Sequence, residues 1–334
     1  MALLAIEGFD HLHGNDLVKK GFSAGYSITS SPSYARFGGQ GVIAAATTDG
    51  FDLEIPSKST IYFGTAIKKA ESGTPVYSFS YPLINFKDES SVSQIRLYVM
   101  PDYSIDVYQG DGTLLGSSAA GTFLNLKWQY LEVKATISAT VGEVTLRINE
   151  NQVLNLTSQD TKNGSDYIKF IRTGCVNSSL QVYYDDLYVD DAQFNGDCRV
   201  KTFMPDSISG TNNSFTASAG NKDECVDEEE QNGDTDYIYS NTLNHKQTFG
   251  ITTGSLGTVL GIQLNNCCRI DEVGTRKITP LIRSNGTDYS GTESDEITAD
   301  YLFESEIWET DPDDAAAWTQ TKLEAAEFGL EITT

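Results

Sequence analysis

The sequence lacks long apolar runs. No stretch approaches the ~20 consecutive apolar residues that a membrane-spanning helix needs, so we expect no membrane insertion. The opening residues, MALLAIEGFD, contain no basic region and only a short apolar stretch, which does not fit a signal peptide. We therefore expect that the protein is not secreted.

Basic residues are also scarce. The 334-residue chain has 23 Lys and Arg against 47 Asp and Glu, which gives a formal net charge of −24. Nucleic-acid binding depends on cations that neutralise phosphates, and an anionic membrane surface attracts cations in the same way. The composition therefore argues against nucleic-acid and membrane partners and indicates a highly soluble surface.

Cysteine motifs for metals and disulfides are missing. The five cysteines are odd in number, and no two of them form a C-x-x-C pair. The adjacent Cys267 and Cys268 would point to opposite faces of a strand, which disfavours a shared metal ion. Because the chain carries no export signal, we expect reduced thiols, most of them buried.

Proline and methionine are few, with 8 and 3 residues, whereas glycine and tyrosine are abundant, with 29 and 17. Clusters of Ser, Thr and Asn separate short apolar stretches, which is typical of many strands joined by turns. The most regular block, residues 128–156, predicts antiparallel strands with one buried and one solvated face. Its alternating apolar residues are Leu131, Val133, Ala135, Ile137, Val144, Leu146 and Ile148.

The stretch LQVYYDDLYVDD, residues 180–191, is rich in residues that favour a pleated, half-buried surface, so it predicts a β-strand. Its apolar residues stand at even-numbered positions in the first half, Val182 and Tyr184, and at odd-numbered positions in the second half, Leu187 and Val189. A β-bulge at Asp185-Asp186 would swap the faces at that point. We therefore predict a bulged strand that closes a first domain.

The chain divides into two predicted domains. Residues 1–195 are expected to form an antiparallel β-sandwich, with a hinge over residues 194–207. Residues 196–334 contain further strand candidates and end in a predicted short helix, with Asp311 as N-cap and Pro312 at the first helical position. The prediction is a mainly β protein with a sandwich followed by a second β-rich domain that carries a C-terminal helix.

Two sets of motifs carry resemblances to known families. The block from Trp128 to Leu156, together with YYDDLYVDD, resembles a concanavalin A-like jelly roll, the sandwich of laminin-G-type and lectin-like modules. The ordered set YYDDLYVDD, GDCRVKTFMPDS, DTDYIYS, PLIRSNGTDYSG and DPDDAAAWT is similar to a family of tailed-bacteriophage virion proteins. This second resemblance implies a structural component on the particle exterior, either associated with the tail or its fibres or decorating the capsid. It implies other virion proteins and copies of the chain itself as partners, with a homo-oligomeric state. It also implies synthesis in the cytoplasm of a bacterial host.

Glycosidase chemistry is the enzymatic option on a sandwich of this kind. It needs two carboxylates that flank the scissile bond, and the E-x-D-x-E pattern that displays them on one strand face is missing. The nearest pattern is Glu304, Glu306 and Glu309, which we interpret as a solvated strand face. The G-x-S-x-G sequence of a nucleophile elbow is also missing. We therefore predict that the protein is not an enzyme.

Acidic clusters supply the candidate metal ligands. Hard carboxylate oxygens suit calcium, but neither the strand 180–191 nor the loop 223–236 follows the spacing of an EF-hand. Neighbouring carboxylates on a strand point apart, so the loop is the better candidate, with ligands Asp227, Asp234 and Asp236. We expect no other cofactor.

Tyrosines offer a route to carbohydrate binding. Exposed aromatic rings stack against sugar faces, and the candidates in the bulged strand are Tyr183, Tyr184 and Tyr188. The opposing interpretation is that these rings pack in the core. Our main hypothesis is a non-enzymatic virion component that acts through protein–protein interfaces. The alternative is a carbohydrate-binding module for host adhesion, assisted by calcium.

Overall fold

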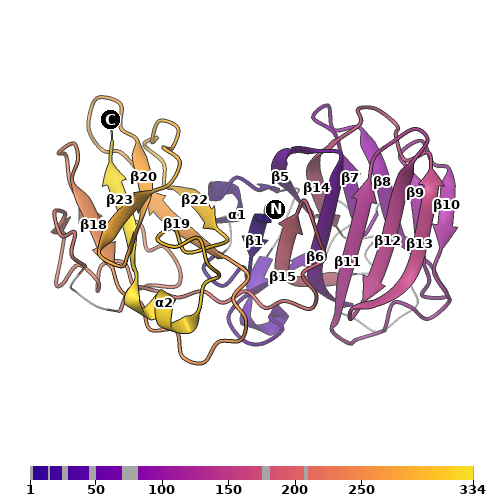
Figure 1. Ribbon diagram of the computed structural model, residues 1–334, viewed down its shortest axis with the longest axis horizontal. Coiled ribbons are helices and arrows are strands. Elements are labelled where there is room, and N and C mark those ends of the chain that lie inside the picture. Colours follow the sequence, from indigo (N-terminus) through magenta and orange to yellow (C-terminus); the bar gives the residue numbers. More distant parts are fainter. Residues whose placement is uncertain are drawn as a thin grey trace. The chain divides into compact units, whose positions relative to one another are not determined.

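The computed structural model describes residues 3–13, 16–24, 29–44, 50–69, 82–174, 181–206 and 210–333. They belong to two compact units, Met1–Lys201 and Thr202–Thr334 (Figure 1). Strands make up nearly all the regular structure of both units, which confirms the predicted mainly β fold. Within the described ranges, no helix has the length and apolar character needed to cross a membrane.

The first sheet of the N-terminal unit follows the order β13-β12-β11-β6-β15-β4-β3, and β1 also pairs with β15. All its pairings are antiparallel. The predicted hairpin is confirmed, because Leu131 and Val133 of β11 face Ile148 and Leu146 of β12. The strands are β1 (Leu3–Glu7), β3 (Thr29–Ser31), β4 (Gly41–Ala44), β6 (Thr60–Lys69), β11 (Gln129–Thr136), β12 (Gly142–Ile148), β13 (Asn151–Gln159) and β15 (Val182–Asp190).

The second sheet follows the order β10-β9-β8-β7-β14-β5-β2. Its strands are β2 (Ser23–Ala24), β5 (Gly50–Lys58), β7 (Ile84–Lys87), β8 (Ser93–Val99), β9 (Ile105–Gln109), β10 (Leu114–Ser117) and β14 (Ile168–Gly174). The two sheets pack face to face through buried aromatic rings. Phe63 of β6 meets Phe86 of β7 edge to face, with ring centroids 6.2 Å apart, and Tyr184 of β15 meets Phe51 of β5 at the same distance. The unit is therefore an antiparallel β-sandwich, as expected.

Strand β15 contains the predicted bulge. Its pairing with β6 shifts register between Asp185 and Tyr188, and Asp186 adopts a left-handed φ of 49°. The extra residue returns the apolar side chains to the core, so Tyr184 before the bulge and Leu187 after it are both fully buried. The predicted bulge is thus confirmed, and it explains why the apolar residues move from even-numbered to odd-numbered positions.

Residues 192–201, which we call the crossing segment, lie over the outer face of the first sheet. The Asn195 amide donates to the Tyr188 hydroxyl (3.0 Å), and the Gly196 amide donates to the Glu132 carboxylate (2.8 Å). The Phe194 ring packs edge to face on Tyr62 of β6, at 4.9 Å. These contacts hold the predicted hinge against the sandwich. The first unit therefore ends after Lys201 and not after residue 195.

The C-terminal unit contains one four-stranded sheet in the order β18-β23-β20-β21 and two paired ladders, β16-β17 and β19-β22. A small core forms where the α2 helix (Gln320–Ala325) packs beside the sheet, and it includes Ile282, Trp318 and Leu323. The strands are β16 (Thr216–Ala217), β17 (Ile238–Tyr239), β18 (Lys246–Phe249), β19 (Ile262–Cys268), β20 (Ile278–Ser284), β21 (Thr287–Ser290), β22 (Leu302–Trp308) and β23 (Glu327–Ile332).

The C-terminal helix begins later than predicted. Its N-cap is Thr319, whose side chain accepts the amide hydrogen of Lys322. Asp311, the predicted cap, is buried and instead accepts the amide hydrogen of Asp313 and pairs with the Lys322 ammonium at 3.1 Å. An Asp-Pro pair fits a helix start and a turn equally well, and here the turn forms.

Four cysteines are free thiols, and Cys175 lies outside the described residues. Cys225 is buried, whereas Cys198, Cys267 and Cys268 are only partly buried, so the expectation of mostly buried thiols was too strong. Burial raises the pKa of the Cys198 and Cys268 thiols to about 12, which keeps them protonated and poorly nucleophilic near neutral pH.

Candidate functional site

A row of side chains crosses the outer face of the first sheet at the N-terminal end of β15. The register places Tyr183 of β15 opposite Lys68 of β6. Trp128 immediately precedes Gln129, which pairs with Ile67, so Trp128 continues the row beyond Lys68. Side chains alternate along a strand, and the neighbours of this row point into the core. The row therefore lies on the face turned away from the second sheet.

Tyr34 completes an aromatic surface around this row. It ends the short η1 turn (Pro32–Tyr34), which Ser31 caps by accepting the Ser33 amide hydrogen. The Tyr34 and Tyr183 rings are stacked, with centroids 4.8 Å apart and an interplanar angle of 26°. The Trp128 ring lies 6.4 Å from Tyr183 at 40°.

The ammonium of Lys68 lies over two of these rings. Its Nζ is 5.9 Å from the centroid of the Trp128 ring and 5.6 Å from that of Tyr183, within the range of cation–π attraction. We call Tyr34, Lys68, Trp128 and Tyr183 the aromatic platform. All four side chains are partly exposed, so ring faces and a positive charge reach solvent together.

The platform includes one of the three tyrosines predicted to contact a glycan. Tyr184 points into the sandwich, where its hydroxyl donates to the Gly174 carbonyl at 2.6 Å. Tyr188 is buried under the crossing segment, and its hydroxyl donates to Glu132 at 2.6 Å. Burial and the neighbouring carboxylate raise the Tyr188 pKa. Neither ring is accessible to a ligand at the surface, so the expectation was wrong for Tyr184 and Tyr188.

The sequence did not assign Tyr34 and Trp128 to this surface. Trp128 was recognised only as the residue that opens a strand, and Tyr34 lies in a Ser/Pro-rich turn far from Tyr183 in the chain. The signal that could have found Trp128 is its parity, which puts it on the same face as the polar residues of β11. No pattern along the sequence connects Tyr34 to Tyr183, because their stacking depends on where η1 crosses the sheet.

The aspartates of the bulge are internal anchors. Asp185 accepts the amide hydrogens of Arg36 (2.7 Å) and Asp186 (2.8 Å), and Asp186 accepts that of Val200 in the crossing segment (2.8 Å). The Arg36 guanidinium binds both carboxylate oxygens of Asp197, at 2.6 and 2.7 Å. Burial raises the pKa of both bulge aspartates, and the charge of Asp186 adds to the shift of Asp185.

The three predicted calcium ligands are not brought together. Asp227 is exposed, and Asp234 pairs with the Arg269 guanidinium at 2.9 Å and accepts the hydroxyl of Tyr301. Asp236 accepts a hydrogen bond from the Asn232 amide group. Across the part of the chain that the structure describes, no group of three or more His, Cys, Asp or Glu side chains is arranged to hold a metal ion. The three predicted ligands therefore do not form one cluster in the described part of the chain.

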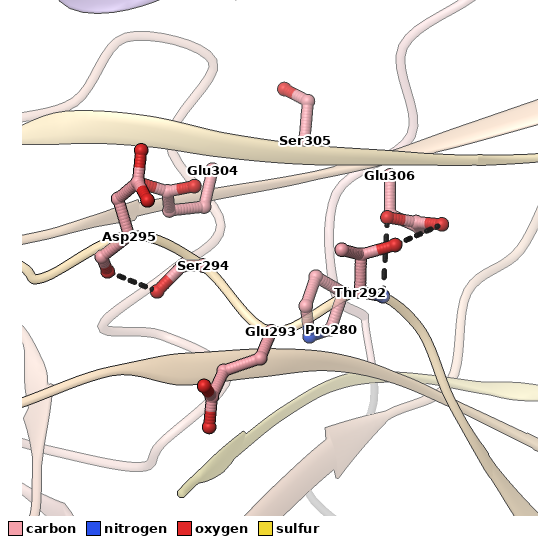
Figure 2. A pocket seen from close by; sticks show the side chains of 8 residues that line it. All are labelled: Pro280, Thr292, Glu293, Ser294, Asp295, Glu304, Ser305 and Glu306. Atoms are coloured by element: carbon pink, nitrogen blue, oxygen red, sulfur yellow. Dashed lines mark hydrogen bonds between the residues drawn. The ribbon is translucent and has the colours of Figure 1, made fainter. Parts of the chain in front are cut away.

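A polar pocket of about 300 Å³ lies in the C-terminal unit, between β22 and the segment that follows β21 (Figure 2). Glu304 and Glu306 project from β22 toward it, and Glu306 accepts the Thr292 amide hydrogen at 3.3 Å. Glu309 is not part of the lining. The lining residues are Pro280, Thr292, Glu293, Ser294, Asp295, Glu304, Ser305 and Glu306.

The pocket corrects the interpretation of Glu304 and Glu306 as a solvated strand face, because both residues are half-buried and line it. Burial raises the pKa of Glu304, and the charge of Asp295 raises it further. Glu304 therefore holds its proton to a higher pH than an ordinary glutamate does.

Comparisons with known proteins give similarity of fold only. No protein-family model and no curated protein matches the chain. An endo-β-1,4-glucuronan lyase from Trichoderma reesei is 10% identical, with 50% of this chain and 87% of the lyase covered and a TM-score of 0.38. A carbohydrate esterase from the Shiga toxin-encoding bacteriophage phi24B is 13% identical, with 57% and 99% covered and a TM-score of 0.39. The carbohydrate-binding module CBM66 from Bacillus subtilis is 8% identical, with 51% and 96% covered and a TM-score of 0.33.

These structures are carbohydrate-active sandwich proteins, and they overturn the prediction that the protein is not an enzyme. That prediction treated the lack of an E-x-D-x-E pattern as evidence against catalysis, yet two of the similar sandwiches are named as a lyase and an esterase. The missing pattern excludes one arrangement of carboxylates and leaves other carbohydrate chemistries open. At these TM-scores, the likeness assigns no activity to this chain.

Proposed function

We propose that the N-terminal sandwich binds carbohydrate through the aromatic platform. The observation that carries the proposal is the stacked pair Tyr34 and Tyr183 beside Trp128, with all three rings partly exposed on one face of the sheet. Aromatic rings on a sandwich are usually buried, as Tyr184 is in the core and Tyr188 is under the crossing segment. Three rings gathered at the surface are therefore a feature that core packing does not explain.

The platform combines the two elements that sugar recognition needs. A pyranose ring has an apolar face of C–H groups, which can lie flat on an aromatic ring and remove apolar surface from water. Its hydroxyl groups require polar partners at the rim of that contact, and the Lys68 ammonium supplies hydrogen-bond donors there. The rings are also held in place before a ligand arrives, by stacking and by their strands, so little conformational entropy is lost on binding.

A glycan array followed by isothermal titration calorimetry tests the proposal. The full chain is expected to bind at least one class of oligosaccharide, and Trp128→Ala and Tyr183→Leu are each expected to weaken that binding by about tenfold, which corresponds to ~1.4 kcal/mol. Tyr239→Ala is the control, because Tyr239 is 51% exposed in the C-terminal unit. Equal affinity in the platform variants and in the control, or an array without any hit, would refute the proposal.

The biological setting is a separate proposal. A role on the exterior of a bacteriophage particle is what the resemblance to tailed-bacteriophage virion proteins implies, and host adhesion through a surface glycan would unite that role with the platform. Mass spectrometry of purified particles, together with light scattering to measure the oligomeric state, tests it. The protein should co-purify with particles as an oligomer, and a monomer that is absent from particles would contradict this setting.

A further inference from the structure

We infer that the platform selects a sugar that bears an acidic group, with Lys68 as the residue that pairs with that group. The inference rests on the proposed function and narrows it to acidic carbohydrates, such as those that contain uronic acid or sulfated residues. The evidence for it is the set of charged groups and aromatic rings around Lys68 in the platform.

Cations in this chain are usually paired with carboxylates. Acidic residues outnumber basic ones by 47 to 23, and several lysines of the sandwich form close ion pairs. Lys58 lies 2.8 Å from Asp191, and Lys87 lies 2.8 Å from Asp52. In a protein of this composition, a partly buried lysine without a carboxylate partner is therefore an exception.

Lys68 is such an exception. Among the described residues it forms no ion pair with a carboxylate. Its ammonium lies over the ring faces of Trp128 and Tyr183. Ring faces attract the charge but accept hydrogen bonds poorly, so these two contacts leave the three N–H donors of the ammonium unoccupied by any described residue. Within the described residues, the ammonium thus lies on an aromatic surface with its hydrogen-bonding capacity available for a ligand.

The position of Lys68 fits recognition of an acidic substituent. It lies between Tyr183 and Trp128 in the row, so a sugar stacked on either ring brings its ring substituents close to the ammonium. A charge-assisted hydrogen bond to a carboxylate or sulfate is about twice as strong as one to a neutral hydroxyl. Lys127, which is exposed and precedes Trp128, adds a second positive charge to this end of the sheet.

The net charge makes this local arrangement informative. At −24, the chain as a whole repels a polyanion, so an acidic glycan would bind only where cations gather locally. A neutral sugar needs a hydrogen-bond donor at the rim but no positive charge, and an uncharged polar residue at position 68 would supply that donor. The lysine in the middle of the platform therefore favours an acidic ligand.

Calorimetry with matched sugars tests the inference in the full chain. The probes are oligogalacturonate, oligomannuronate and oligoglucuronate, each compared with its methyl ester, which keeps the sugar shape and removes the charge. Sulfated and unsulfated dextran oligosaccharides form a separate arm that distinguishes sulfate from carboxylate. We expect at least one acidic form to bind about tenfold more tightly than its neutral counterpart, and the difference to shrink as salt is raised from 50 to 300 mM, since salt screens exposed charges.

Variants at position 68 test whether Lys68 causes the preference for the acidic form. Lys68→Met should abolish the preference for the acidic form while the neutral form still binds, and Lys68→Arg should restore most of the preference. Lys162→Met, at an exposed lysine of the same unit, is the control and should bind like the parent protein. Equal affinity for the acidic and neutral forms, or an acidic preference that survives in Lys68→Met, would overturn the inference and leave the proposed function intact. If the parent protein binds neither the acidic nor the neutral form of any sugar, the proposed function is refuted as well.

Discussion

The hydroxyl of Tyr188 donates a 2.6 Å hydrogen bond to the carboxylate of Glu132, and both side chains are buried on the outer face of the sheet. The same hydroxyl accepts the amide hydrogen of Asn195, and Glu132 accepts that of Gly196. One side-chain pair thus fastens the crossing segment at two consecutive residues. The crossing segment in turn excludes water from a face that alternation along the strands would leave solvated.

Removal of this hydroxyl should loosen the crossing segment. In Tyr188→Phe, Glu132 and the Asn195 amide each lose a partner, which should cost about 1–2 kcal/mol of local stability because buried polar groups are left unsatisfied. Hydrogen exchange measured by mass spectrometry should show faster exchange in peptides from residues 194–200. Tyr108→Phe, at a partly exposed ring of the second sheet, is the control. Unchanged protection of residues 194–200 would contradict this role of Tyr188.

Gly64 of β6 is expected to tolerate no side chain. A Cβ atom built at this position would overlap the ring of Tyr188, which is buried and cannot move aside. Gly64→Ala should lower the free energy of unfolding of the first unit by about 1–3 kcal/mol through overpacking. Urea unfolding followed by Trp128 fluorescence measures it, provided that Trp308 and Trp318 are replaced by phenylalanine in all variants.

Gly257→Ala provides the matched control for this substitution. A Cβ at Gly257 meets no atom within 4 Å, so the unfolding free energy should change by less than ~0.5 kcal/mol. If Gly64→Ala were as stable as Gly257→Ala, the Tyr188 ring would have to occupy a different position.

The bulge aspartates should make the first unit less stable as the pH rises. A carboxyl with a raised pKa holds its proton more tightly in the folded protein than in the unfolded chain. Its contribution to stability is complete below the unfolded value of ~3.9 and is lost as pH rises through the folded pKa. Asp185 is buried beside Asp186, and its pKa is raised by burial and by the charge of that neighbour.

Asp185→Asn tests this pH dependence. The amide stays neutral at every pH, so the variant should lose less unfolding free energy than the parent between pH 5 and pH 9. Asp160→Asn, at an exposed loop position, should follow the parent curve. Parallel curves for the parent and Asp185→Asn would show that Asp185 ionises in the folded protein as readily as in the unfolded chain.

The N-cap of α2 should contribute measurably to the C-terminal unit. Thr319→Ala removes the oxygen that accepts the Lys322 amide hydrogen, and the loss of an N-cap typically costs about 1 kcal/mol. Urea unfolding followed by the fluorescence of Trp308 and Trp318 measures the effect, with Trp128 replaced by phenylalanine throughout. Thr319→Ser keeps the oxygen and should unfold like the parent. Equal destabilisation in the two variants would point to the lost methyl group instead of the cap.

Local periodicity accounts for the parts of the fold that the sequence predicted. The bulge at Asp185-Asp186 and the hairpin of β11 and β12 both follow from the spacing of apolar residues, because burial on one face fixes the register of a strand. The helix start was wrong because Asp311-Pro312 satisfies a turn and a helix N-terminus equally well. Only the packing of Leu323 and Trp318 in the core decides between them.

The candidate site was harder to predict because it depends on contacts that are distant in the sequence. The alternation of β15 would have put Tyr188 on a solvated face, and the crossing segment that covers it is polar and has no periodicity. Tyr183 was identified from its residue type alone. Its neighbours Tyr34 and Trp128 come from a turn and a strand end whose positions the tertiary fold determines.

The crossing segment also determines how the first unit would respond to tension. Force applied through the chain after Lys201 first reaches the Val200 amide on Asp186, then the Gly196 amide on Glu132, and then the Asn195 amide on Tyr188. Asp186 and Tyr188 belong to β15, so these bonds pass load to that strand until they break, starting from Val200. Since β15 lies between β6 and β4 within the sheet, the main chain of β15 would be pulled directly only after the crossing segment had peeled away. The crossing segment would thus act as a short extensible tether that lengthens before β15 is drawn out of the sheet.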